Sequence, residues 1–335
     1  MSQRIICWNT RKHTKKEFNM KITVTDIDTV TRGDLSFDFL ERLGEVSYYG
    51  ITAENEVSER IKDSDIVLCN KTPLNRNNLK DAKNLKYIGL FATGYNNIDI
   101  EYCRERGITV CNSPAYSTDS VAQLTFALIL ELTNRVCDYR SLVDKGDWKK
   151  SRTFSMFPIP LMELRGKTLG IIGFGSIGAR TAEIALAFGM RVLAFNRSPK
   201  AANGVEFTDL DTLLAQSDIV SLHCPLNEQS KNLINENAIN KMKQGAYLIN
   251  TARGPVVDEN ALAAALKSGR LAGAGVDVLC TEPMSEDCPL YGIPSCIITP
   301  HIAWAGLETR ERLLEIVFDN IRAFLEGETV NNVAE

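Results

Sequence analysis

An arginine, a glutamate and a histidine in the second half of the sequence are suited to carboxylate binding and acid–base chemistry. Each follows an apolar run of strand length: Arg253 comes after Ala246 to Asn250, Glu282 after Ala272 to Val276, and His301 after Cys296 to Thr299. An arginine can bind a carboxylate through two parallel hydrogen bonds. A histidine can donate a proton to a carbonyl oxygen near neutral pH, and a neighbouring carboxylate favours the protonated imidazole. Alone, each could be a loop or surface residue, but together they predict a catalytic site.

A glycine-rich turn upstream of these residues predicts a dinucleotide site. The apolar run Leu169 to Ile172 leads directly into a GFGSIG stretch, and apolar residues at helical spacing follow. This strand–turn–helix context favours a dinucleotide fingerprint over an ordinary glycine-rich turn, which is the alternative. Gly173 would permit the tight turn, Gly175 would let a pyrophosphate approach, and Gly178 would let the helix pack on the strand. The helix N-terminus, at Ser176 and Ile177, would offer N–H groups to the phosphates.

Parallel sheets are the elements that would position these residues. Strand and helix patterns alternate from residue 20 to about 110 and again from 166 to 300, which predicts an α/β fold with helices covering parallel sheets. Ligands of such sheets bind outside the carboxyl ends of the strands. One long, mostly apolar helix is expected from Val121 to about Lys145, as the crossover into the second domain. A terminal helix is expected from Leu307 to Leu325.

Composition excludes several other classes of function. The chain has 335 residues, 44% of them hydrophobic, and a net charge of −4, which is ordinary for a globular protein and gives no reason to expect nucleic acid. No apolar run suggests a membrane span or a secretory signal. Nine cysteines without framework spacing indicate reduced thiols in a cytoplasmic protein, and three scattered histidines predict no metal site. Residues 1–19 are basic and are interpreted as a flexible extension.

The motifs resemble those of the D-isomer-specific 2-hydroxyacid dehydrogenases. The resemblance rests on the glycine turn, on His223-Cys-Pro-Leu226, on Leu248 to Gly254, on Gly275-Val-Asp-Val278 with Glu282-Pro, and on Thr299-Pro-His301. It implies two Rossmann-like doubly wound parallel-sheet domains. The substrate domain would be split between residues 20–117 and 301–335, with a dinucleotide-binding domain at 118–300. The family resemblance also implies a homodimer, with the long helix from Val121 at its interface.

The same resemblance implies roles for individual residues. His301 would be the general acid and base, Glu282 its partner, and Arg253 the ligand of the substrate carboxylate. Asp277 would bind the nicotinamide carboxamide. The loop Thr93-Gly94-Tyr95 would bind the substrate carboxylate through backbone N–H groups. Further cofactor contacts are expected at Asn196, Arg197, Ser198, His223, Pro225, Thr251, Ala252, Arg253 and His301.

The end of the second strand of the dinucleotide domain departs from the NAD pattern. NAD-binding proteins place an acid there for the ribose hydroxyls, whereas this sequence has Asn196-Arg197-Ser198. Arg197 and Ser198 could bind a 2′-phosphate, so NADP is favoured over NAD. The alternative is that Arg197 stacks on the adenine and that either cofactor serves.

The substrate expected is a small 2-oxo or 2-hydroxy acid. The loops at Cys69 to Pro73 and at Ala92 to Asp99 resemble most the glycerate dehydrogenase and hydroxypyruvate reductase branch, which favours hydroxypyruvate and glyoxylate. Lys71 could contact a second polar group of the substrate or could be a solvated loop lysine. D-Lactate dehydrogenase is the next candidate. A dinucleotide-sensing protein, like the related C-terminal binding corepressors, is the alternative from another functional class.

Overall fold

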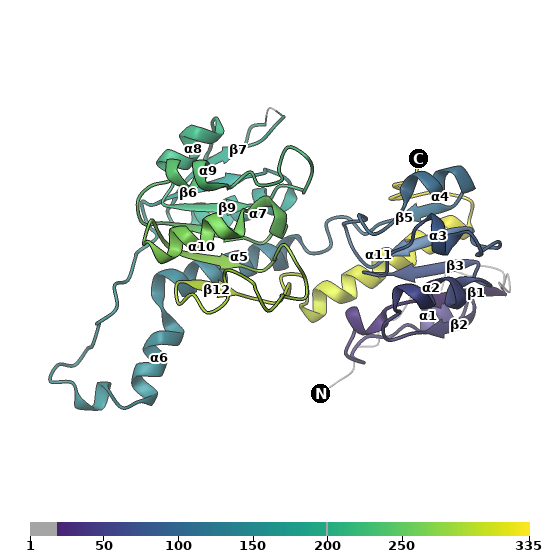
Figure 1. Cartoon of the computed structure of the whole chain (residues 1–335), viewed down its shortest axis with the longest axis horizontal. Helices are drawn as coiled ribbons and strands as arrows, with labels where there is room; N and C mark the ends of the chain where they lie inside the picture. The colour runs from purple at the N-terminus through teal and green to yellow at the C-terminus, as the bar shows by residue number, and fades with distance from the viewer. Residues whose placement is uncertain (1–18, 199) are drawn as a thin grey trace. The chain divides into compact units, whose positions relative to one another are not determined.

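The computed structural model describes residues 19–198 and 200–335, which divide into two compact units. The first unit contains the chain up to Tyr116 together with Arg310–Glu335, and the second contains Ser117–Thr309. Each unit is a sheet covered by helices (Figure 1). The predicted extension at 1–19 lies, except for its last residue, outside the described residues.

The first unit is built on a five-stranded parallel sheet with the order β2-β1-β3-β4-β5. Its strands are β1 (Met20–Val24), β2 (Gly44–Tyr48), β3 (Ile66–Cys69), β4 (Tyr87–Leu90) and β5 (Thr109–Cys111). Its helices are α1 (Asp38–Glu41), α2 (Val57–Ile61), α3 (Arg76–Leu79), α4 (Ile100–Arg106) and most of α11 (Leu307–Leu325). Strands β3 and β4 are buried throughout, which is why they read as unbroken apolar runs.

The second unit has a seven-stranded parallel sheet with the order β12-β11-β10-β9-β6-β7-β8. Its strands are β6 (Thr168–Ile172), β7 (Arg191–Phe195), β8 (Val205–Phe207), β9 (Ile219–Leu222), β10 (Ala246–Asn250), β11 (Leu271–Val276) and β12 (Cys296–Ile298). Its helices are α5 (Thr118–Asn134), α6 (Val136–Asp144), α7 (Ser176–Ala187), α8 (Leu210–Gln216), α9 (Glu236–Lys241) and α10 (Glu259–Lys267). The order reverses between β6 and β9, which makes the sheet doubly wound and places a ligand crevice at that point.

The expected helix from Val121 to Lys145 is wrong as a single element. Arg135 adopts a left-handed conformation with φ of 52°, and it separates α5 from α6. The backbone N–H of Arg135 still bonds to Glu131 O at 2.9 Å, and the Glu131 carboxylate accepts from Cys137 N at 3.1 Å. Glu131 thus caps the start of α6. The apolar pattern contains no glycine or proline at this break, so the sequence carried no stop signal.

The chain returns to the first unit at Arg310 rather than at residue 301. The segment before Arg310 is held in the second unit, because Ser120 Oγ donates to Ala303 O at 2.6 Å and Asp277 accepts from Ile302 N at 2.9 Å. Helix α11 then packs in the first unit, where the ring centroids of Phe318 and Phe39 lie 4.9 Å apart.

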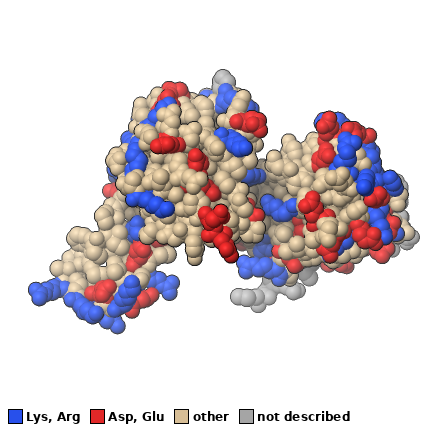
Figure 2. Space-filling view, in the orientation of Figure 1, with Lys and Arg blue, Asp and Glu red and all other residues tan. Residues whose placement is uncertain are grey.

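Charges of both signs are interspersed over the surface shown in Figure 2. Among residues 19–198 and 200–335, no helix is long and apolar enough to cross a membrane.

Arg310 fastens α11 to the loop that follows β1. The side chain is 8% exposed, and its Nη1 and Nη2 atoms each lie 2.7 Å from an Asp34 carboxylate oxygen. The hydrogen bonds from Arg310 hold the pKa of Asp34 well below its usual range. Because the folded state favours the ionised carboxylate, this contribution to stability is present above pH 3.8 and is lost as the pH falls below it.

We expect Arg310→Met to lower the free energy of unfolding by about 1–3 kcal/mol at pH 7, because the variant removes a charged hydrogen-bond partner. The difference from the wild type should narrow at pH 3, where the Asp34 carboxyl of the unfolded chain is mostly protonated while the native ion pair still keeps it ionised. Urea unfolding of the variant and the wild type at pH 7 and pH 3 measures the difference in their free energies of unfolding. Arg322→Met, which removes an exposed pair with Asp319 on the same helix, is the control and should change stability by less than about 0.5 kcal/mol. Equal losses for the two variants would contradict the interpretation.

Candidate active site

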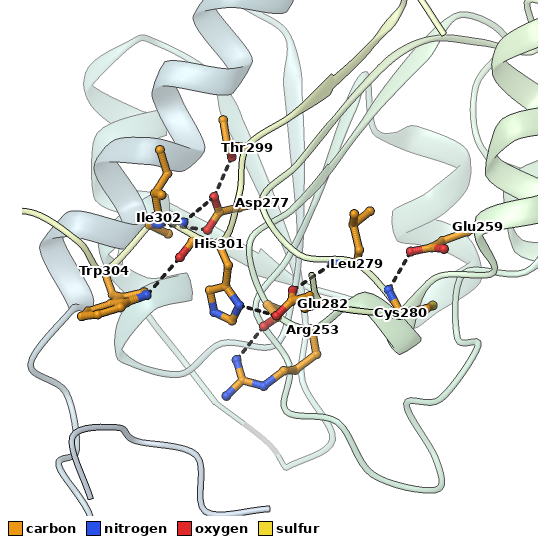
Figure 3. Close-up of polar contacts among 12 residues, drawn as sticks. Arg253, Glu259, Asp277, Leu279, Cys280, Glu282, Thr299, His301, Ile302 and Trp304 are labelled. Carbon is orange, nitrogen blue, oxygen red and sulfur yellow. Dashed lines mark hydrogen bonds and ion pairs between the residues drawn. The ribbon is translucent and has the colours of Figure 1, made fainter. Parts of the chain in front are cut away.

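The carboxyl ends of three neighbouring strands carry the predicted catalytic residues. Strands β10, β11 and β12 pair in parallel in that order, so the loops after them leave one edge of the sheet. Arg253 follows β10, Glu282 follows β11 and His301 follows β12. Figure 3 shows their three side chains lying beside one another. The sequence prediction that these residues share one edge is therefore correct, although their roles depend on the contacts described next.

Glu282 holds the imidazole of His301. His301 Nδ1 lies 2.7 Å from Glu282 Oε2, a separation typical of a charge-assisted hydrogen bond. The other carboxylate oxygen, Oε1, accepts from Leu279 N at 3.0 Å. Because both oxygens of Glu282 are engaged, the ring is oriented and Nδ1 is occupied. Nε2 is the nitrogen that can then exchange a proton with a bound molecule.

The buried carboxylate of Asp277 folds the loop that carries His301. One oxygen accepts from Thr299 Oγ1 at 2.6 Å and from Ile302 N at 2.9 Å, and the other accepts from Ala303 N at 2.9 Å. His301 N also bonds to Asp277 O at 2.8 Å, and His301 has a φ of 54°. Burial raises the pKa of Asp277 above its usual value, and these hydrogen bonds, which favour the ionised form, offset only part of that effect. This positioning role was missed by sequence reasoning, which assigned Asp277 only to the nicotinamide.

The loop of Arg253 is folded by the last residue of β10. Asn250 is 1% exposed; its Nδ2 donates to Arg253 O at 3.0 Å and its Oδ1 accepts from Ala252 N at 3.1 Å. A Cβ on Gly254 would lie 1.9 Å from the Leu279 carbonyl carbon, so the segment leading to Glu282 packs directly on this loop. Arg253 Nη1 donates to Ala252 O at 2.7 Å. Its guanidinium has five N–H donors, enough to bind a carboxylate as well.

The glycine turn between β6 and α7 has the geometry of a phosphate cradle. A Cβ on Gly173, whose φ is 96°, would lie 2.6 Å from Cys224 N, and a Cβ on Gly178 would lie 2.3 Å from Gly173 O. No described heavy atom lies within 4 Å of a Cβ built on Gly175. The turn therefore packs tightly against protein backbone at Gly173 and Gly178, whereas space for a bound molecule remains beside Gly175. The first residues of α7, Ser176 and Ile177, follow this open side.

His223, which follows β9, presents a buried polar atom near the same turn. Its Nε2 lies 2.9 Å from Ser221 Oγ. Its Nδ1 is buried, and no group in the described part of the chain bonds to it. Burial lowers the pKa of His223 to about 4, so the ring is neutral at pH 7. The residues present thus fit a dinucleotide, because an open turn and a buried nitrogen in need of a partner are adjacent.

The loop after β7 is tied to the glycine turn by Asn196. Asn196 Oδ1 accepts from Phe174 N at 3.0 Å and its Nδ2 donates to Ser198 O at 2.8 Å. Arg197 and Ser198 are exposed, and Arg197 Nη1 donates to Gln229 Oε1 at 3.0 Å.

The remaining predicted cofactor residues of this unit lie in the loops after β9 and β10. Pro225 O accepts from Ser230 Oγ at 2.7 Å, and Thr251 Oγ1 pairs with Thr125 Oγ1 at 3.0 Å. Ala252 is half-buried beside Arg253. These contacts hold the two loops in place, and both loops lie at the carboxyl edge of the sheet.

The predicted substrate residues of the first unit lie in the loops after β3 and β4. Asp26, which is 3% exposed, accepts from the backbone N–H groups of Asn70, Lys71 and Thr72 at 2.9, 2.6 and 2.8 Å. It fixes the backbone from which Lys71 extends, a role that the sequence analysis missed. Its position directly after the first strand was the available signal. Thr93 Oγ1 donates to Ser113 O at 2.7 Å, Gly94 follows it, and Tyr95 is exposed.

Across 19–198 and 200–335, no group of three or more His, Cys, Asp and Glu side chains is arranged to hold a metal ion.

Known proteins are similar to this chain over most of its length. Residues 126–303 match the family model for the NAD-binding domain of D-isomer-specific 2-hydroxyacid dehydrogenases. The chain is 44% identical over 320 residues to a hydroxypyruvate reductase of Blautia hydrogenotrophica, an alignment that covers 94% of this chain and 99% of the relative.

Two solved structures have the same fold. An acyclic imino acid reductase, Bsp5, in complex with NADPH and D-Arg superposes with a TM-score of 0.84 at 32% identity, covering 94% of this chain and 100% of that one. A D-lactate dehydrogenase of Aquifex aeolicus, complexed with NAD and lactic acid, has a TM-score of 0.81 at 34% identity, covering 92% and 96%. This chain belongs to the D-isomer-specific 2-hydroxyacid dehydrogenase family of oxidoreductases that use a nicotinamide dinucleotide.

Proposed function

We propose that this enzyme reduces a small 2-oxo acid, with hydroxypyruvate and glyoxylate favoured, to the D-2-hydroxy acid. The observation that carries the proposal is the His301–Glu282 pair at 2.7 Å, with Arg253 beside it, on the sheet that also carries the glycine turn. The similarity to a hydroxypyruvate reductase supports this choice of substrate. D-Lactate formation from pyruvate is the second candidate, supported by the similarity to a D-lactate dehydrogenase structure with lactic acid.

The residues have complementary roles in the proposed reaction. When bound, the reduced nicotinamide supplies a hydride to C2 of the oxo acid. Arg253 binds the substrate carboxylate through its planar fork of donors. His301 gives the proton on Nε2 to the carbonyl oxygen as negative charge develops there, and it takes a proton from the hydroxyl in the reverse direction. Glu282 orients the ring and stabilises the imidazolium.

The first unit would contribute to substrate identity. We propose that backbone N–H groups at Thr93, Gly94 and Tyr95 bind the substrate carboxylate. Lys71 would contact the hydroxyl of hydroxypyruvate, a group that glyoxylate lacks. Asp26 supports this assignment, because its buried carboxylate accepts three backbone N–H groups and so fixes the backbone from which the Lys71 side chain extends.

The cofactor favoured is NADP. Between Arg191 and Glu206 the chain has no acidic residue to repel a 2′-phosphate, and Arg197 and Ser198 are exposed at the end of β7. The pyrophosphate would lie over Gly173, Gly175 and Gly178, against the N–H groups of Ser176 and Ile177. The other contacts proposed for the cofactor are Asn196, His223, Pro225, Thr251, Ala252, Arg253, Asp277 and His301.

A homodimer is proposed through the second unit. Residues 136–163, here called the arm, extend away from the sheet in Figure 1. The arm carries Phe154 and Phe157, which are 93% and 76% exposed. A groove of about 420 Å³, which includes Phe126 and Leu130, lies on α5 and α7. Large exposed aromatic side chains are typical of a protein interface, and a second copy would cover both surfaces.

We expect His301→Ala and Arg253→Ala to lower kcat/KM for hydroxypyruvate by about 10²–10⁴-fold, because each removes a group that acts on the reacting atoms. Cofactor binding, followed by nicotinamide fluorescence, should survive in both variants, because Arg253 and His301 are only two of many proposed cofactor contacts. Glu282→Gln should lower kcat with a smaller effect on KM, and Glu286→Gln, an exposed glutamate in the same loop, is its control. Near-normal turnover of both His301→Ala and Arg253→Ala would refute the assignment.

Initial rates of NADPH and NADH oxidation with hydroxypyruvate test the cofactor preference. At subsaturating cofactor we expect NADPH to be oxidised roughly 10–100-fold faster, the range given by one charge-assisted hydrogen bond. Faster oxidation of NADH would leave the reaction intact and reject the 2′-phosphate argument.

Analytical ultracentrifugation tests the dimer. The wild type should sediment as a dimer, and the double variant Phe154→Ser with Phe157→Ser should shift toward the monomer because it removes exposed apolar surface. Tyr291→Ser, at another exposed aromatic residue (69%), should leave the dimer unchanged. A wild-type monomer at micromolar concentration would contradict the proposal.

A further inference from the structure

A lysine outside the predicted site contacts the glycine turn. Lys200 Nζ donates to Phe174 O at 2.7 Å. Phe174 is the residue between Gly173 and Gly175, so this bond places an ammonium group on the backbone of the dinucleotide cradle. The sequence motif gave no reason to include Lys200, since it lies beyond the segment Asn196-Arg197-Ser198 that directly follows β7.

The partner of Lys200 is rigid although the lysine itself is exposed. The loop after β7 holds Phe174 on both sides of its backbone, because Asn196 Oδ1 accepts from Phe174 N at 3.0 Å while Lys200 binds the carbonyl. The ring of Phe174 is 6% exposed and packs edge-on against Phe207, with centroids 5.0 Å apart. A fixed carbonyl therefore sets the position of the ammonium group.

The surroundings of Lys200 favour an anion. From Val192 to Val205 the chain contains the cations Arg197 and Lys200 and no acidic residue. The two cations take different directions, because Arg197 reaches the loop after β9 through Gln229 at 3.0 Å while Lys200 reaches the glycine turn at 2.7 Å. The exposed hydroxyl of Ser198 lies between them in the sequence. An anionic group at the end of β7 would thus meet two cations of one loop and no acidic residue of that segment.

Lysine chemistry allows one ammonium group to serve both the turn and an anion. The group has three N–H donors around a compact charge. One donor is directed at Phe174 O, so two can be directed at phosphate oxygens. A lysine that only tied the turn together would serve NAD and NADP equally, whereas a lysine that binds a 2′-phosphate would distinguish them.

We propose that Lys200 is a specificity-determining residue that binds the 2′-phosphate of NADP while it is anchored to Phe174 O. This inference rests on the NADP preference proposed above and adds a residue to it. The position of Lys200 on the turn links recognition of the 2′-phosphate to the cradle that holds the pyrophosphate.

Calorimetric titration with two cofactor fragments separates the alternatives without turnover. Adenosine 2′,5′-bisphosphate carries the 2′-phosphate, and 5′-AMP lacks it. We expect the wild type to bind the bisphosphate more tightly. Lys200→Met should weaken bisphosphate binding about tenfold or more and leave 5′-AMP binding unchanged, because a charged hydrogen bond to the 2′-phosphate is lost. Lys200→Arg should retain part of the preference.

Lys267→Met is the matched control. Lys267 is exposed at the end of α10, which packs on β11, several strands away from β7 in the sheet. This variant should bind both fragments as the wild type does, and thermal melting should show that each variant is folded.

Three outcomes would overturn the proposal, and they differ in what else they affect. If Lys200→Met weakens the binding of both fragments equally, Lys200 only stabilises the glycine turn and does not recognise the 2′-phosphate. An unchanged preference in Lys200→Met, with a wild type that prefers the bisphosphate, would reject Lys200 and leave the NADP preference to Arg197 and Ser198. A wild type that binds both fragments equally would reject the NADP preference itself.

Discussion

The buried carboxylate of Asp277 is the contact on which the rest of the candidate active site depends. It accepts three hydrogen bonds from the segment between Thr299 and Ala303, and a buried carboxylate without such donors would be costly. These bonds hold His301 with a left-handed backbone, so that its ring meets Glu282 from the neighbouring loop. The same loop of Glu282 packs on Gly254 and thereby stays beside Arg253. One buried acid thus fixes the loop of His301, and the packing of Leu279 on Gly254 brings the loops of Glu282 and Arg253 together beside it.

The parallel sheet places the glycine turn and the catalytic loops in a fixed order along its carboxyl edge. The glycine turn follows β6, and the catalytic loops follow β10, β11 and β12, with β9 between them. Adjacent strands lie about 4.8 Å apart, so β6 and β11 are separated by roughly 14 Å. The proposed cofactor would run along the carboxyl edge over that distance, with its adenosine end near β7 and its reactive end near β11. His223, at the end of β9, lies along this path and offers its buried Nδ1.

Features that depend on short-range pattern were predictable from the sequence, and features that depend on tertiary contacts were not. The unbroken apolar runs gave β3, β4 and β6, and the topology of parallel sheets then brought Arg253, Glu282 and His301 to one edge. The break at Arg135 was missed because Glu131 caps α6 from the preceding helix, a contact with no local signal. Asp26 and Asp277 were likewise missed as positioning residues, since their donors lie more than twenty residues away along the chain.

The residues proposed for catalysis and those proposed for cofactor choice rest on different kinds of structure. The loops of His301 and Arg253 are supported by the buried groups Asp277 and Asn250, respectively, whose hydrogen bonds leave little freedom to these loops. The end of β7 instead presents Arg197 and Lys200 as exposed side chains, and only the backbone beneath them is rigid. Exposed charged contacts contribute little to folding stability, so these residues can be replaced at small cost to the fold. In the proposed assignment, the sheet constrains the catalytic loops tightly, and the choice of dinucleotide falls to a few side chains on one loop.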